Sequence, residues 1–147
     1  MATRKTPDGG ALRYVETSLL LAALLEGDLA ARRALRHSGT LVTSALTFAE
    51  ARRAVVRARR SQRLTPEQER STLGALTRIR RRCAVVPVTE DVLLRVGKPF
   101  PVEPIRTLDA IHLSTAGMLT DDPPLLTVLT RDTRIIANAA MIGYPVE

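Results

Sequence analysis

Hydrophobic and polar positions along the chain predict short strands that are each followed by a helix. Residues 12–15 are apolar and rich in strand formers, and the apolar run at 19–25 has the length of a helix. The same order recurs at 41–43 with 47–60, at 83–88 with 89–96, and at 125–129 with 133–141. Strands that alternate with helices predict an α/β protein, a three-layer α/β/α sandwich around a central, mainly parallel sheet.

Three more helices and a last strand complete the expected elements. Thr65 can cap a helix, Pro66 suits its first position, and Gln68 completes a capping box, so a helix is expected from there to about residue 81. Shorter helices are expected at 28–37 and 108–118, and a strand at 144–146 after Gly143 stops the preceding helix.

The length of 147 residues fits one domain. Residues 1–10 are polar and end in two glycines, so we expect a flexible leader there and a single domain over 11–147. The longest apolar run, 19–25, is far below the roughly 18 residues that a membrane span requires, so we expect no membrane partner. A lone cysteine, Cys83, and the absence of a signal-peptide pattern favour the cytoplasm.

The net charge of +7 makes polyanions plausible partners, and the cations are almost all arginines. Arginine pairs with phosphate or carboxylate through two parallel hydrogen bonds. One cluster supplies five candidate contacts to an RNA backbone or to an acidic protein groove: Arg52, Arg53, Arg57, Arg59 and Arg60. Aromatic residues make up only 3%, which argues against a base-stacking platform, and a solvated helix face stays open as the simpler interpretation.

Four acids stand at the boundaries of predicted elements, among apolar or small residues. Glu16 ends the first strand, Glu50 lies near the start of the long helix, Asp109 opens another helix, and Asp132 follows the strand at 125–129. In a parallel sheet the ends of these strands and the starts of these helices share one edge. We therefore expect the four carboxylates to meet there.

Carboxylates gathered in this way need a cation. Two like charges about 5 Å apart repel by roughly 3 kcal/mol at an effective dielectric near 20. Ligation by oxygen alone suits Mg²⁺ or Mn²⁺, for which Glu16, Asp109 and Asp132 are the candidate ligands. A water held by such an ion can attack a phosphodiester.

Each acid taken alone also has a structural interpretation. Glu50 can pair with Arg53 three residues on, and the other three acids can favour helix N-termini. The hydroxyls of Ser18 and Thr130 can orient a metal-bound water or an acid, or can cap helices. His112 lies on the face of Asp109 and is expected to be a packed, hydrogen-bonded histidine.

The motifs around the four acids resemble those of PIN-domain ribonucleases of the VapC toxin type. The matching stretches, in order, are YVETSLL at 14–20, TSALTFAE at 43–50, TLDAIHLSTA at 107–116 and LTRD at 129–132. The resemblance implies Mg²⁺- or Mn²⁺-dependent cleavage of RNA and inhibition by a cognate antitoxin, and it leaves a homodimer open. It departs at Glu16, where the family usually has Asp, and the longer side chain displaces the carboxylate by roughly 1 Å, which can cost about 100-fold in rate.

Two other function classes remain. A receiver-like or phosphatase-like domain also gathers acids at strand ends, but such folds use a lysine near the phosphoryl group, and Lys5 and Lys98 are poorly placed. A catalytically weakened or silent module that binds RNA or a protein partner would use the arginines alone. No glycine-rich phosphate loop opens a helix in this sequence.

Overall fold

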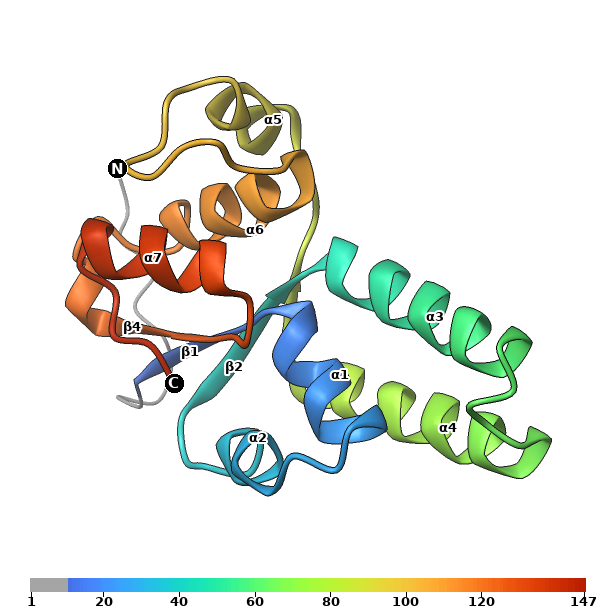
Figure 1. Cartoon of the computed structure of the whole chain (residues 1–147). Coiled ribbons are helices and arrows are strands. Elements are labelled where there is room, and N and C mark those ends of the chain that lie inside the picture. The colour runs from blue at the N-terminus through green and yellow to red at the C-terminus, as the bar shows by residue number, and fades with distance from the viewer. Residues whose placement is uncertain (1–10) are drawn as a thin grey trace.

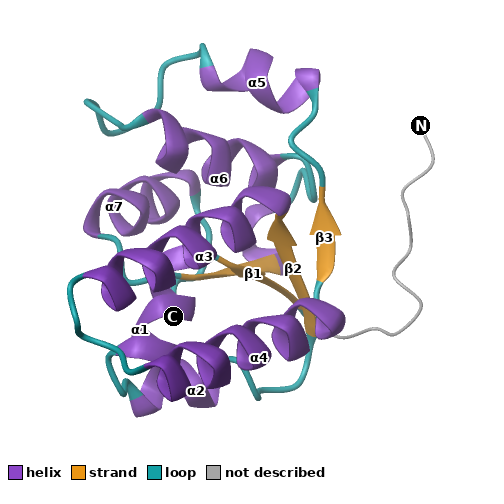
Figure 2. Ribbon diagram, turned by 90° about the vertical axis from the view of Figure 1, so that its right-hand side faces the viewer, coloured by secondary structure: helices purple, strands orange, loops and turns teal. Residues whose placement is uncertain are grey.

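The computed structural model describes residues 11–147, and the expected leader at 1–10 lies outside the described residues. Within them, seven α-helices surround a four-stranded parallel sheet (Figures 1 and 2). In chain order the elements are β1 (Leu12–Val15), α1 (Thr17–Leu25), α2 (Leu29–Ala34), β2 (Thr40–Ser44), α3 (Ala45–Arg60), α4 (Pro66–Arg82), β3 (Ala84–Val86), α5 (Glu90–Val96), α6 (Thr107–Gly117), the 3₁₀ turn η1 (Pro123–Leu125), β4 (Leu126–Leu129) and α7 (Thr133–Ile142).

The strands lie in the order β3-β2-β1-β4, and every pairing is parallel. Tyr14 stands opposite Val42 on one side and Val128 on the other. The chain moves outward from β1 through β2 to β3 and then returns to the far side of β1. The strand order therefore reverses between β1 and β4, the position where open α/β sheets bind ligands beyond the carboxyl ends of their strands.

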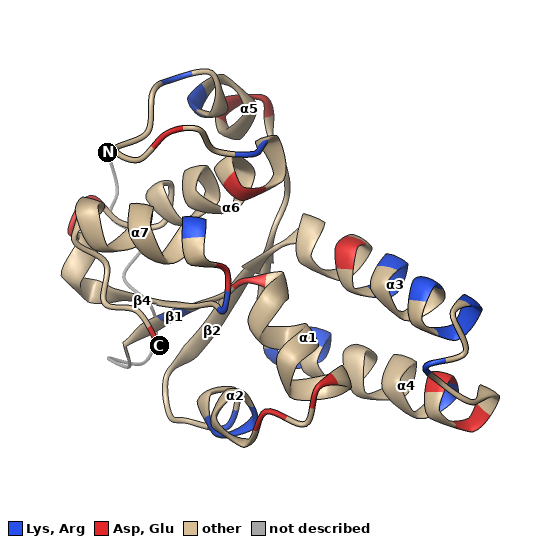
Figure 3. Cartoon of the chain, in the orientation of Figure 1, with Lys and Arg blue, Asp and Glu red and all other residues tan. Residues whose placement is uncertain are grey.

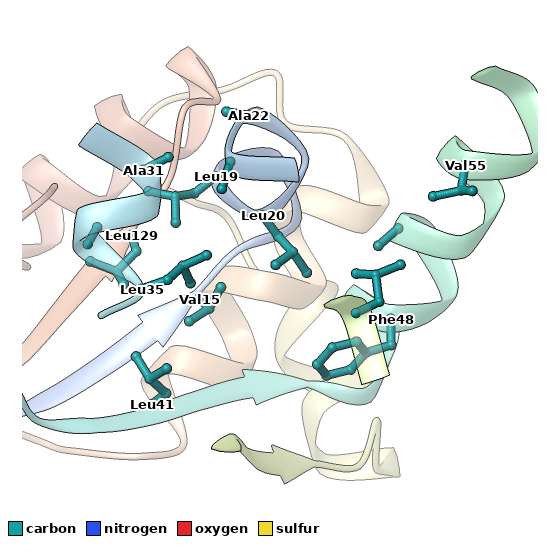
Figure 4. Packing of buried hydrophobic residues seen from close by; sticks show 14 residues of the cluster. Val15, Leu19, Leu20, Ala22, Ala31, Leu35, Leu41, Phe48, Val55 and Leu129 are labelled. Atoms are coloured by element: carbon teal, nitrogen blue, oxygen red, sulfur yellow. The ribbon is translucent and has the colours of Figure 1, made fainter. Parts of the chain in front are cut away.

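Side chains on the two faces of the sheet form two separate cores. Val15, Leu41 and Leu129 pack with helices α1 to α4 on one face (Figure 4). Tyr14 and Val128 point to the opposite face, where they pack with α6 and α7. Alternate residues of a strand point to opposite faces, so each buried strand serves both layers. The predicted three-layer α/β/α architecture is confirmed.

Side-chain caps define most of the helix starts. Thr65 and Gln68 form the predicted capping box at α4, and Thr89 caps α5. Among the described α-helices only α6 begins without a side-chain cap hydrogen bond. At the other end of the chain, α7 stops at Gly143, which takes a left-handed φ of 105°.

Several expected boundaries differ from those in the structure, and helix α2, expected at 28–37, ends at Ala34. Strand β3 covers only Ala84–Val86, because Pro87 has no N–H to continue the ladder. Helix α3 begins at residue 45 rather than 47, since the Ser44 side chain accepts from Leu46 N and caps it. The expected strand at 144–146 is reduced to one bridge between Val128 and Val146.

The loop from α5 to α6 is held against α7 by one buried amide. Asn138 Oδ1 accepts from Val102 N at 2.9 Å, and Asn138 Nδ2 donates to Val102 O at 2.9 Å. The same nitrogen also donates to Arg134 O within α7. The oxygen and the nitrogen of this buried amide are both used in hydrogen bonds within the protein, so we assign Asn138 a structural role.

Helices α3 and α4 run side by side away from the sheet and form a helical arm (Figure 1). Arg80 of α4 lies over the Phe48 ring of α3, with 5.3 Å from the guanidinium carbon to the ring centroid. Leu76 is the buried residue of α4, at 1% exposure, and belongs to the core of α1 to α3. None of the described helices combines the length and apolarity that a bilayer span would need.

Replacing Leu76 with Ala should lower the free energy of unfolding by about 2–5 kcal/mol, because a buried leucine leaves a cavity when truncated. Urea titration followed by circular dichroism measures the change. The control is Leu94→Ala, at a leucine that is 66% exposed, where a change within about 0.5 kcal/mol is expected. Equal losses in the two variants would contradict the packing of α4 on the core.

Candidate active site

The four acids selected from the sequence lie around the carboxyl edge of the sheet. Glu16 directly follows β1, and Asp132 comes three residues after β4 ends. Glu50 lies in the second turn of α3 and Asp109 in the first turn of α6. Acidic segments at the starts of α1, α3 and α6 surround this edge in Figure 3.

Glu16 is buried and caps helix α1. Its Oε2 accepts a hydrogen bond from Ser18 N at 3.0 Å, a short one from the Ser18 hydroxyl, and one from Thr130 Oγ1 at 2.8 Å. Thr130 Oγ1 in turn accepts from Asp132 N at 3.1 Å. Ser18 and Thr130 therefore orient the first acid, and this network joins the end of β1 to the loop after β4.

Glu50 is held by a chain of polar groups rather than by Arg53. Its Oε1 lies 2.7 Å from Thr17 Oγ1, which donates to it, and 2.7 Å from His112 Nε2. Burial opposes ionisation of this carboxyl, but the hydrogen bonds from His112 and Thr17 outweigh it and lower the pKa of Glu50. Glu50 is therefore an anion at neutral pH.

His112 links Glu50 to the sheet. Its Nδ1 lies 2.9 Å from the Tyr14 hydroxyl, and both side chains are 1% exposed. Burial raises the pKa of Tyr14 far above its usual value, so this hydroxyl keeps its proton. The Tyr14 hydroxyl can donate to Nδ1 while Nε2 donates to Glu50. Nε2 also lies 3.9 Å from Glu16 Oε1, so His112 stands between two of the acids.

Asp109 and Asp132 share one arginine. Arg106 Nε donates to Asp109 Oδ2 at 2.7 Å, and Arg106 Nη2 donates to Asp109 Oδ1 at 3.3 Å and to Asp132 Oδ2 at 2.8 Å. The hydrogen bond to Asp109 raises the pKa of Arg106 above its already high value. The other oxygen of Asp132, Oδ1, accepts from Arg134 N and Ile135 N and caps α7.

The structure thus brings the acids together as two pairs, each around a nitrogen group. Glu16 and Glu50 flank His112, and Asp109 and Asp132 flank Arg106. Sequence reasoning found the acids and expected His112 to be packed and hydrogen-bonded, but it assigned no function to Arg106. The position of Arg106, three residues before Asp109, is the spacing of a helical ion pair and was the available signal.

A divalent ion fits one of these pairs. Among residues 11–147 no three His, Cys, Asp or Glu side chains lie close enough together to hold a metal ion in the present arrangement. Asp109 and Asp132 nevertheless converge on one positive group, and their carboxylate oxygens are the donors that Mg²⁺ and Mn²⁺ prefer. Glu16 can add only Oε1, because three donors occupy its Oε2.

A row of arginines begins beside this site. Arg53, Arg57 and Arg60 follow Glu50 by three, seven and ten residues, so they share its face of α3, and all three are exposed. Arg52 is exposed on an adjacent face, whereas Arg59 is half-buried and lies 3.6 Å from Glu69 of α4. Of the five arginines singled out from the sequence, Arg59 is therefore the least available to a partner.

Replacing Tyr14 with Phe should lower the free energy of unfolding by about 1–3 kcal/mol, because His112 Nδ1 would lose its partner in a buried site. Thermal unfolding measures the loss. Tyr144→Phe is the matched control, since the Tyr144 hydroxyl makes no hydrogen bond to residues 11–147 in this structure, and its effect should be smaller. A larger loss for Tyr144→Phe would contradict the assigned network.

Comparison with solved structures finds this fold in a toxin and in chains of larger complexes. A chain of a toxin-antitoxin complex from Klebsiella pneumoniae is 24% identical, with a TM-score of 0.59 and coverage of 92% of this chain and 95% of that one. VapBC2 from Rickettsia felis, bound to a DNA fragment from its promoter, is 14% identical, with a TM-score of 0.62 and coverage of 92% and 97%. Mycobacterium tuberculosis VapC20, a toxin that cleaves the sarcin-ricin loop, is 16% identical, with a TM-score of 0.63 and coverage of 90% and 95%.

These likenesses show a shared fold. No curated protein matches the sequence. The family model of the PIN domain matches residues 13–140, a span that includes both acid pairs and most of every layer of the sandwich. The chain belongs to the PIN domain family.

Proposed function

We propose that this protein is a metal-dependent endoribonuclease that uses Mg²⁺ or Mn²⁺ and is the toxin of a toxin-antitoxin pair. The observation that supports this most is that four acids lie where the strand order reverses. Two of them, Asp109 and Asp132, share hydrogen bonds with Arg106. Such a cluster is unfavourable without a cation, and phosphodiester hydrolysis is the chemistry that a hard cation promotes.

In this proposal Asp109 and Asp132 would hold the ion, with Glu16 contributing through Oε1. The ion would supply charge neutralisation at the phosphate and a more acidic bound water. Glu50 Oε1 already accepts from Thr17 and His112, whereas Oε2 has no hydrogen-bond partner among the described residues. Glu50 can therefore orient the attacking water through Oε2, and Ser18 and Thr130 keep Glu16 in position.

RNA would approach along the arginine row of α3. Arg53, Arg57 and Arg60 extend from the acids along the arm and would neutralise successive phosphates. The toxin assignment draws on structural neighbours that were determined as toxin-antitoxin complexes. An antitoxin partner, a homodimer and action in the cytoplasm belong to the same proposal.

The alternative is a weakened or silent PIN domain that only binds RNA or a protein partner. The capping of α1 by Glu16 supports it, since two donors of Ser18 and one of Thr130 hold its Oε2 between α1 and the loop after β4. Fold and family are the same in both cases, so only an activity measurement separates them.

Purified protein should cleave a stem-loop RNA containing the sarcin-ricin loop, the structure cut by one structural neighbour, when Mn²⁺ or Mg²⁺ is present. Chelator should stop cleavage, and Asp109→Asn should lower the rate by at least about 100-fold, because even a 1 Å misplacement in an active site can cost that much. Gel electrophoresis of end-labelled RNA measures the rate.

The comparison with Glu16→Asp decides between the two functions. A working nuclease should cleave as wild type and gain rate in this variant, whereas a domain silenced by its longer side chain should cleave only in this variant. Cleavage that persists in chelator and in Asp109→Asn would refute the metal mechanism.

The double variant Arg53→Gln/Arg57→Gln should weaken RNA binding and flatten its salt dependence. For each arginine that no longer neutralises a phosphate, the slope of log K against log salt should fall by about 0.7 for a single strand. Fluorescence anisotropy at several salt concentrations measures both effects. Arg33→Gln/Arg36→Gln, two exposed arginines in and just after α2, removes the same charge as a control. Equal effects in the two variants would contradict a specific role of the α3 row, and RNA binding by wild type that does not change with salt would point to an acidic protein groove instead.

A further inference from the structure

The Arg106 side chain combines high solvent exposure with several hydrogen bonds. Its side chain is 59% exposed, yet its guanidinium makes three hydrogen bonds to the two acids beside it. No other hydrogen bond of this side chain is present among the described residues. The guanidinium is therefore anchored by Asp109 and Asp132 alone, and its stem is open to solvent.

The guanidinium occupies the position that a cation bound by both acids would need. Arg106 Nη2 touches Asp109 Oδ1 and Asp132 Oδ2, so one nitrogen lies between the two carboxylates. A Mg²⁺ or Mn²⁺ ion would need these same oxygens at about 2.0–2.2 Å. A doubly charged ion and a guanidinium would also repel each other strongly at that distance. The two cations exclude one another.

No other arginine of the site can take this role. Arg131 is turned away and pairs with Asp28 at 2.9 Å. Arg134 contributes only its backbone N–H to Asp132, and its side chain forms no ion pair in the described part of the chain. Arg106 cannot leave by losing its proton, because guanidinium stays charged at any physiological pH. It can leave only by rotating its exposed stem.

We propose that Arg106 is the resident counter-ion of the Asp109–Asp132 pair, and that a divalent ion binds by displacing its guanidinium into solvent. Arg106 therefore sets the metal concentration at which the site becomes loaded. Without metal it stabilises the two acids, and with metal it competes for them. This inference rests on the proposed function, which supplies the metal.

The test is Mn²⁺ binding to the full chain, measured by calorimetry on wild type and Arg106→Met. Methionine keeps an unbranched apolar stem but has no charge. We expect Mn²⁺ to bind about tenfold more tightly to the variant, since a charge-assisted hydrogen bond is worth at least that factor. We also expect a lower melting temperature without metal and a larger rise on adding Mn²⁺.

Two further variants make the test specific. Arg134→Met removes an equal charge from the neighbouring helix but keeps the backbone N–H that donates to Asp132, so its Mn²⁺ affinity should stay within about twofold of wild type, because an exposed charge without a partner contributes little. Arg106→Lys keeps the charge but lacks the fork that bridges both acids, and it should fall between wild type and Arg106→Met. Circular dichroism establishes that each variant is folded.

The outcomes separate this inference from the proposed function. An unchanged or weaker Mn²⁺ affinity in Arg106→Met, with metal-dependent cleavage intact in wild type, would overturn the counter-ion role and leave the nuclease proposal standing. Absence of Mn²⁺ binding in wild type and in Arg106→Met at millimolar concentrations would overturn both.

Discussion

Electrostatic repulsion among four buried or half-buried carboxylates is the constraint on which this structure depends. The parallel sheet brings the acids to one edge, and a fold that did so without partners for them would be unstable. Each pair of acids is instead supplied with a nitrogen group, His112 in one case and Arg106 in the other. The two groups differ in kind, because the histidine is enclosed by protein and the arginine is largely in solvent.

Helix N-termini also stabilise the ionised carboxylates. Glu16 accepts backbone N–H at the start of α1, and Asp132 does the same for α7. The positive end of a helix stabilises an anion there. Asp109 lies in the first turn of α6, whose N-cap is Arg106 itself. One arginine thus begins the helix, neutralises its first acid and reaches across to the next helix.

The sequence was sufficient to predict the parallel sheet, the capping box at Thr65, and the edge of the sheet around which the four acids lie. These features depend on local patterns and on the rule that parallel strands end at one edge. The partners of the acids were not predictable in the same way. Glu50 had Arg53 at helical spacing, but it bonds to His112, 62 residues away, because the tertiary fold brings these two side chains together. The single bridge at Val146 also depends on tertiary pairing that periodicity does not encode.

Asn138 couples the movement of α7, which begins at Asp132, to that of the loop before Arg106. The helix that carries this amide begins at Asp132, and the loop that the amide grips leads into Arg106. A rigid tilt of α7 would therefore carry both sides of the arginine bridge in the same direction and leave its geometry intact. Glu50 has no such tie to α7, but its hydrogen bond to His112 joins it to α6, the helix that carries Asp109. Movement of the arm would have to break this bond before Glu50 could separate from the aspartates.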